Sequence, residues 1–186
     1  PLISLHGYAG TGKTFIALAA ALSEVLDPAT PYQKVTIIRS VVELRPMGFL
    51  PGTVEEKISE YEQPYKEIFK ELMKYKNPYD HAKALGYVEF LPTSFLRGVT
   101  FNDQIVIVDE SENMDYAELS TVVTRIGQNA KVVFIGDDAQ TDLTRRREKS
   151  GFHAFRKVLR NMPSNLTGFI EFGINDIVRS ELVKQY

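Results

Sequence analysis

The feature that most constrains the fold is a glycine-rich turn between an apolar run at 2–6 and an amphipathic segment at 15–26. In that segment, apolar residues recur at the spacing of one helix face. The turn fits the pattern G-x-x-x-x-G-K-[ST], whose backbone N–H groups surround phosphates at the start of a helix. The eight residues of this predicted phosphate-binding loop are Gly7, Tyr8, Ala9, Gly10, Thr11, Gly12, Lys13 and Thr14.

Two side chains of this loop have a specific chemical role in the pattern. Lys13 is expected to reach the β- and γ-phosphate oxygens of a nucleoside triphosphate. The hydroxyl of Thr14 is expected to coordinate Mg²⁺. The loop therefore predicts a site for a nucleotide with its magnesium ion.

The rest of the chain alternates short apolar runs with amphipathic segments, which is typical of a mainly parallel sheet with helices on both faces. We expect one α/β domain over 1–186, with Pro64 in the first turn of a new helix. The predicted strands are 34–40, 87–91, 105–108, 132–135 and 169–172, and the predicted helices are 53–63, 64–73, 115–127, 152–162 and 174–183.

Acidic residues follow the β-branched run 105–108, which has the composition of a strand buried on both faces. Asp109 is therefore expected at the carboxyl edge of the sheet, where open α/β folds bind ligands. There it would hold Mg²⁺ through water. Glu110 stands where ATPases keep a carboxylate that polarises the attacking water.

A third motif follows the predicted strand 132–135 and reads Gly-Asp-Asp-Ala-Gln over 136–140. The amide of Gln140 can hydrogen-bond both a γ-phosphate oxygen and a water molecule. We expect Gln140 to sense whether the γ-phosphate is present, and a polar turn at a strand end is the alternative.

Composition excludes several other classes of protein. The net charge of −2 excludes a generally basic nucleic-acid coat. With no cysteine, the chain has no disulfide, no iron–sulfur cluster and no thiol catalysis, which fits the reducing cytoplasm. The longest apolar run, 15–22, is far shorter than the roughly 20 residues of a membrane span. The three histidines are scattered, and we expect none to bind a metal.

Taken together, these motifs resemble those of the PhoH family of phosphate-starvation-inducible ATPases. The resemblance also rests on the segments 48–52, 95–98, 124–127 and 176–179 and runs in order along nearly the whole chain. It implies a RecA-like P-loop ATPase core related to the first motor domain of superfamily 1 helicases. It also implies ATP and Mg²⁺ as cofactors and an action on RNA or single-stranded nucleic acid.

Several positions depart from the family pattern. Arg39 is followed by Ser40 where the family has Thr-Arg-Pro, and Val99 replaces a second arginine. Asp-Leu-Thr at 142–144 replaces Asp-Leu-Pro. The aromatic element that reads adenine in the family is expected before Pro1. The preference for ATP over GTP is therefore implied by the resemblance, together with the absence of an Asn-Lys-x-Asp guanine motif.

The arginines allow more than one interpretation. Arg39 and Arg97 are each expected to contact phosphate, nucleic acid or an acidic neighbour. Arg125 can simply compensate a helix dipole. The run Arg145–Arg147 is either a solvated loop or a nucleic-acid contact. Tyrosines between 61 and 79 fall mostly at helical spacing and are expected in the core or at its rim.

A single motor domain also predicts a homo-oligomer. Related helicases complete the ATP site with an arginine from a second motor domain, so we expect another copy to supply it in a head-to-tail ring of six. Arg179 is the first choice for this arginine and Arg125 the second. Alternatively, Arg179 pairs with Asp176 or Glu181 on its own helix.

The sequence thus favours a Mg²⁺-dependent ATPase that binds ATP and ADP, acts in the cytoplasm and does not enter a membrane. Lys13, Glu110, Gln140 and Arg179 are its predicted catalytic residues, and Thr14 and Asp109 its metal ligands. Two other functions stay open: a small P-loop kinase, and a nucleotide-gated binding module with little turnover.

Overall fold

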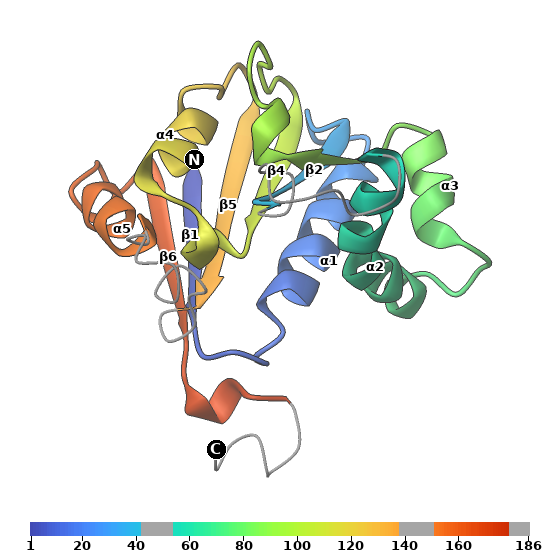
Figure 1. Cartoon of the computed structure of the whole chain (residues 1–186), viewed down its shortest axis with the longest axis horizontal. Coiled ribbons are helices and arrows are strands. Elements are labelled where there is room, and N and C mark those ends of the chain that lie inside the picture. Colours follow the sequence, from blue (N-terminus) through green and yellow to red (C-terminus); the bar gives the residue numbers. More distant parts are fainter. Residues whose placement is uncertain (42–53, 138–150, 179–186) are drawn as a thin grey trace.

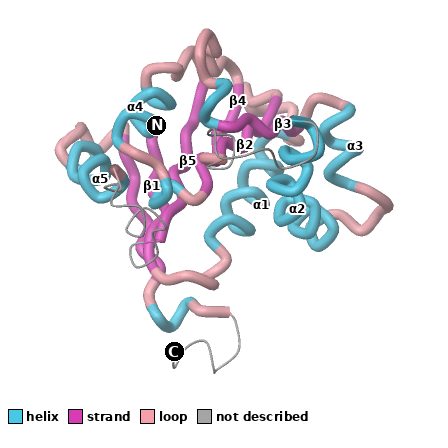
Figure 2. The backbone as a smooth tube through the Cα atoms, viewed as in Figure 1, coloured by secondary structure: helices cyan, strands magenta, loops and turns pink. Residues whose placement is uncertain are grey.

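A computed structural model describes residues 1–41, 54–137 and 151–178. Its centre is a six-stranded, entirely parallel sheet in the order β3-β2-β4-β5-β1-β6 (Figures 1 and 2). The predicted fold class, a RecA-like P-loop α/β fold, is confirmed. The strands are β1 (Leu2–Gly7), β2 (Lys34–Arg39), β3 (Val88–Pro92), β4 (Gln104–Asp109), β5 (Ala130–Asp137) and β6 (Thr167–Phe172).

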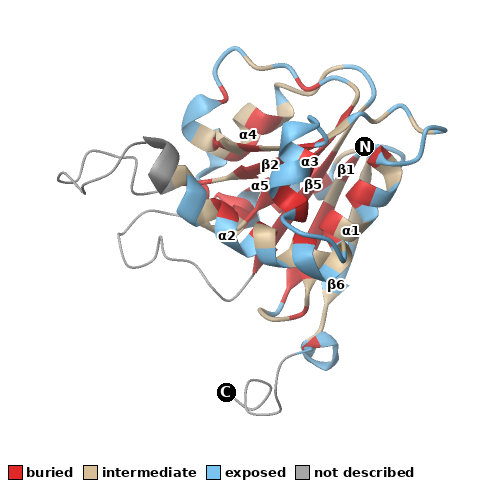
Figure 3. Ribbon diagram, turned by 90° about the vertical axis from the view of Figure 1, so that its right-hand side faces the viewer, coloured by how far each residue is buried: buried red, intermediate tan, exposed pale blue. Residues whose placement is uncertain are grey.

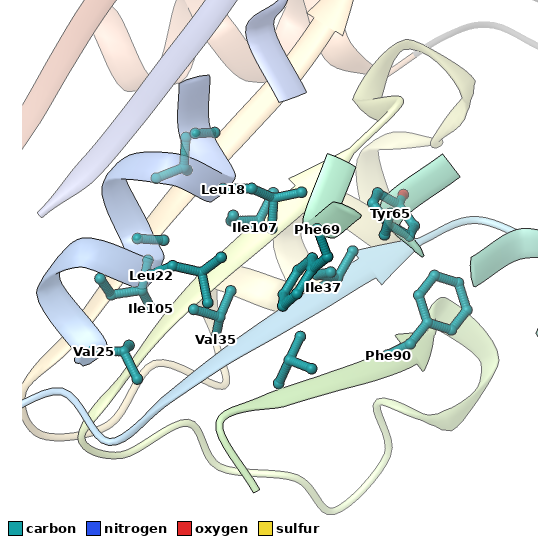
Figure 4. Packing of buried hydrophobic residues seen from close by; sticks show 14 of the residues in the cluster. Leu18, Leu22, Val25, Val35, Ile37, Tyr65, Phe69, Phe90, Ile105 and Ile107 are labelled. Atoms are coloured by element: carbon teal, nitrogen blue, oxygen red, sulfur yellow. The ribbon is translucent and has the colours of Figure 1, made fainter. Parts of the chain in front are cut away.

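The sheet buries both of its faces because successive side chains of a strand point to opposite sides. On β4, Ile105 and Ile107 belong to one hydrophobic cluster, whereas Val106 and Val108 belong to the other. The first cluster lies under α1 (Lys13–Val25), α2 (Val54–Leu72) and α3 (Pro78–Ala84). Figure 4 shows its residues from α1, α2 and the strands. The second lies under α4 (Tyr116–Val123) and α5 (Phe152–Arg160). Helices therefore cover both faces, and the strands form the buried centre in Figure 3.

Strand order and register bring the sequence motifs to one edge of the sheet. All six strands are parallel, so their carboxyl ends lie together. Arg39 at the end of β2 is the register partner of Asp109 at the end of β4. Gly7 at the end of β1 is the partner of Asp137 at the end of β5. The strand that leads into the glycine-rich turn is separated by one strand, β5, from the strand that leads into the acidic pair.

The prediction that Pro64 begins a new helix is wrong. Pro64 lies inside α2, which continues to Leu72. An interior proline removes one helical hydrogen bond and costs about 3 kcal/mol. Tyr65 and Phe69, on the turns that follow, are both fully buried in the first hydrophobic cluster. Their packing holds the helix together through the proline.

The predicted helix 174–183 is wrong over its described residues. Ile174–Asp176 form a short 3₁₀ turn, and Ile177 is extended with a ψ of 116°. The carboxylate of Asp176 accepts a hydrogen bond from the backbone N–H of Gly173 at 2.8 Å and closes the turn. The N–H of Val178 then donates to the carbonyl of Gly10 at 3.1 Å. This contact with the glycine-rich turn replaces the next helical hydrogen bond.

The predicted strands are confirmed to within a few residues. Helix α3 was not expected from the sequence. A capping box begins α4: Asp115 accepts from the N–H of Glu118 at 2.8 Å, and Glu118 accepts from the N–H of Asp115 at 3.0 Å. Within the described residues, we find no helix with the length and apolarity needed to cross a membrane.

Candidate nucleotide and metal site

The glycine-rich turn forms a tight loop between β1 and α1. Gly7, Gly10 and Gly12 have positive φ angles of 129°, 74° and 77°. A side chain at Gly7 would also place its Cβ 2.0 Å from the carbonyl oxygen of Phe172, because β6 approaches the loop there. Gly12 caps α1 without a side-chain oxygen, so the positive end of the helix faces the loop. The local structure is that of an anion-binding loop.

Lys13 bends back over this loop and is buried, with 8% of its surface exposed. Its Nζ donates to the carbonyl oxygen of Tyr8 at 2.5 Å and to that of Gly7 at 3.2 Å. The hydroxyl of Thr11 lies 3.3 Å away. The ammonium group is thus held against the oxygens of the loop, at the position from which it can reach a phosphate.

The two predicted metal ligands meet, although 95 residues separate them. The hydroxyl of Thr14 donates to Oδ1 of Asp109 at 3.0 Å, and the hydroxyl of Tyr65 donates to Oδ2 at 2.9 Å. Asp109 is buried, with 7% of its surface exposed. Carboxylate and hydroxyl oxygens are hard ligands of the kind that Mg²⁺ binds together with water and phosphate oxygens. The donor set therefore fits a magnesium ion bound with a nucleotide.

Glu110 follows Asp109 in the left-handed conformation, with φ at 51° and ψ at 44°. Its Oε1 accepts from Nη2 of Arg39 at 2.5 Å. Burial raises the pKa of Glu110 above its ordinary value, the adjacent Asp109 raises it further, and Arg39 opposes both. The sequence left three partners open for Arg39: phosphate, nucleic acid or an acidic neighbour. The structure shows the acidic neighbour, Glu110. The guanidinium also lies over the ring of Tyr61, 5.6 Å from its centre.

Glu112, in the short 3₁₀ turn Ser111–Asn113, is a further acid of this edge that the sequence motifs did not single out. Burial raises the pKa of Glu112 to about 8, and the backbone N–H groups of Glu112 and Asp137 oppose that rise. Glu112 therefore carries a proton at neutral pH.

A hollow of about 560 Å³ lies at the carboxyl ends of β2 and β3 and the start of α4. Glu118 bridges its walls, accepting from the hydroxyl of Thr93 at 3.0 Å and from that of Ser40 at 3.4 Å. The hollow brings together Arg97 and Arg125, which lie far apart in the sequence. Its lining comprises Ser40, Val41, Thr93, Ser94, Leu96, Arg97, Asp115, Ala117, Glu118, Thr121 and Arg125.

Several elements of the sequence analysis lie outside the described residues: Gln140, the run Arg145–Arg147, Arg179, and the segments 48–52 and 142–144. Of the third motif, the structure places Asp137, which is buried at the end of β5 beside Gly7. Among the described residues, no group of three or more acidic, histidine or cysteine side chains forms a metal cluster. Sequence reasoning missed Tyr65 as a partner of Asp109, and its only signal was a tyrosine on the buried face of a helix.

Comparisons with known proteins show which family the chain resembles along its length. The family model described as "PhoH-like protein" matches residues 1–186. The Escherichia coli K12 protein named "Protein PhoH" is 32% identical over 99% of this chain and 51% of its own length. A "PhoH-like protein" of Synechocystis is 32% identical over 96% of this chain and 53% of its own length. "Protein PhoH2" of Bacillus subtilis is 36% identical over 76% of this chain and 33% of its own length.

The chain thus spans between a third and about half of these relatives. The family is one of P-loop NTPases, which matches the parallel sheet and the glycine-rich loop. By its sequence over the full length and by its fold, the chain belongs to the PhoH-like protein family.

Proposed function

We propose that this chain binds Mg²⁺–ATP and hydrolyses its β–γ bond. The observation that carries the proposal is the meeting of Thr14 and Asp109 at the mouth of the glycine-rich loop. A hydroxyl from the loop and a carboxylate from the strand end can together bind a Mg²⁺ ion that is also bound to the phosphates of the nucleotide. The choice of ATP over GTP follows the family resemblance.

Each residue has a stated task in the proposed reaction. The N–H groups of 7–14 bind the phosphates, and Lys13 exchanges its carbonyl partners for β- and γ-phosphate oxygens. Thr14 and Asp109 hold Mg²⁺, which would neutralise charge on the phosphates. Glu110, anchored by Arg39, orients the attacking water and accepts its proton. Gln140 is proposed to sense the γ-phosphate.

The same proposal includes coupling to RNA or another single-stranded nucleic acid. Arg97 and Arg125 line the hollow at the carboxyl edge, next to the strand end that carries Arg39. Their guanidinium groups can neutralise a phosphodiester backbone. Arg145–Arg147 are proposed as a further contact with nucleic acid, on the basis of their charge alone. Neutralising Arg145–Arg147 together should leave basal hydrolysis intact and lower the salt dependence of nucleic-acid binding. An unchanged salt dependence would mean that this run is a solvated loop.

The active form is proposed to be a head-to-tail ring of six subunits, with Arg179, or else Arg125, completing the site of the neighbouring copy. Mixing Lys13→Ala subunits with Arg179→Ala subunits tests this, because each variant alone lacks one half of every site. Recovered hydrolysis on mixing supports shared sites. A fully active monomer contradicts the ring.

The test of the whole function is phosphate release from Mg²⁺–ATP, with and without single-stranded RNA or DNA. We expect release without any acceptor, and Lys13→Ala should abolish tight nucleotide binding. Release that requires an acceptor would favour a P-loop kinase. Tight binding with release near the uncatalysed rate would favour a nucleotide-gated binding module.

A further inference from the structure

Helix α2 presents two tyrosines, one turn apart, to the acidic pair at the end of β4. The ring of Tyr61 lies under the guanidinium of Arg39, which in turn binds Glu110. The hydroxyl of Tyr65 lies 2.9 Å from Oδ2 of Asp109. A helix that contains none of the recognised motifs is thus connected to both acids.

The contact between Tyr65 and Asp109 is fully enclosed. Tyr65 has no exposed surface, and its ring packs 5.8 Å from that of Phe90 (Figure 4). A phenylalanine would fill the same space without bringing a polar atom into the core. A buried hydroxyl is costly to leave without a partner, and here its partner is the carboxylate of Asp109.

Two donors hold the carboxylate of Asp109, one at each oxygen. Thr14 donates to Oδ1 and Tyr65 donates to Oδ2, so each oxygen has one fixed partner and the plane of the carboxylate is set. The phenol of a tyrosine is protonated at neutral pH, so the Tyr65 hydroxyl is a donor to this carboxylate.

We propose that Tyr65 is a positioning residue of the magnesium site: its hydroxyl orients the Asp109 carboxylate and thereby sets the affinity for Mg²⁺. This inference rests on the proposed function. Groups that hydrogen-bond to a metal-binding side chain orient it, and their loss typically costs 10- to 100-fold in metal affinity. Because Tyr65 belongs to α2, the packing of that helix becomes part of the metal site.

The chain offers a matched control for removing this hydroxyl. Tyr79 is also buried, with 1% of its surface exposed, and its hydroxyl donates to Oε1 of Glu62 at 2.9 Å. Tyr65→Phe and Tyr79→Phe therefore each remove one buried hydroxyl from a carboxylate. Only the first carboxylate belongs to the proposed metal site.

The experiment titrates Mg²⁺ into the full chain with a fluorescent ATP analogue and records the Mg²⁺ concentration at half-maximal tightening of binding. Tyr65→Phe should raise that concentration about 10-fold and leave the affinity measured in EDTA unchanged. Tyr79→Phe should behave like the wild type. Thermal unfolding of both variants checks that each is folded.

Two results would overturn the inference alone: wild-type Mg²⁺ dependence in Tyr65→Phe, or an equal shift in Tyr79→Phe. The second result would mean that the loss of any buried hydroxyl loosens the site. If the nucleotide affinity of the wild-type chain did not depend on Mg²⁺, that result would instead overturn the proposed function, and this inference with it.

Discussion

Replacing Arg39 with methionine tests the anchor of Glu110, because methionine keeps much of the apolar stem and removes the guanidinium. The pair is short, 2.5 Å between Nη2 and Oε1, and only partly enclosed, with 18% of the Arg39 side chain and 39% of the Glu110 side chain exposed. Exposed ion pairs couple by about 0.2–1 kcal/mol. Removing one partner of a fully buried pair costs about 3–5 kcal/mol. The exposure places this pair between those limits, near 1–2 kcal/mol.

A double-mutant cycle measures this coupling free energy directly. Urea unfolding is recorded for the wild type, Arg39→Met, Glu110→Gln and the double variant, and the coupling is the departure from additivity. We expect about 1–2 kcal/mol, reduced at high salt because Glu110 is partly exposed. Additive effects of the two substitutions would refute the reasoning, since they would mean that Arg39 does not hold Glu110 in solution.

Two further predictions concern stability. Glu112→Gln should stabilise the protein increasingly as pH rises from about 5 to 8, because the folded chain keeps a proton with a pKa of about 8 that the unfolded chain releases near 4.5; chemical unfolding at several pH values should show a gain of roughly 3–4 kcal/mol across this window, and a pH-independent effect would contradict it. Gly7→Ala should lower the melting temperature and abolish nucleotide binding, because its Cβ would lie 2.0 Å from the Phe172 carbonyl at a φ of 129°; normal melting and binding would show that β6 does not approach the loop so closely.

The sequence could predict the parts of the fold that depend on local pattern. The β-branched run before Asp109 and the helical spacing after Thr14 each reflect burial along one element, and both elements form as expected. Pro64 was misleading because the helix it interrupts is held by long-range packing of Tyr65 and Phe69. Such packing has no signature within a single segment.

The same distinction between local sequence pattern and long-range packing applies to the candidate site. A contiguous motif reveals the phosphate loop, and a strand followed by two acids reveals Asp109 and Glu110. The contact of Tyr65 with Asp109 joins residues 44 apart through helix packing, and an amphipathic helix does not show which of its buried tyrosines meets a carboxylate. The pairing of Arg39 with Glu110 likewise depends on β2 lying beside β4.

The most direct test of the central claim compares Glu110→Gln with the wild type in two assays, binding of Mg²⁺–ATP and single-turnover hydrolysis. The amide keeps the shape of the side chain and cannot accept the proton of the attacking water. We predict near wild-type affinity and hydrolysis lower by about 10²–10⁴-fold, the usual contribution of a positioned base. Hydrolysis at the wild-type rate would contradict the account, because Glu110 would then have no part in the reaction.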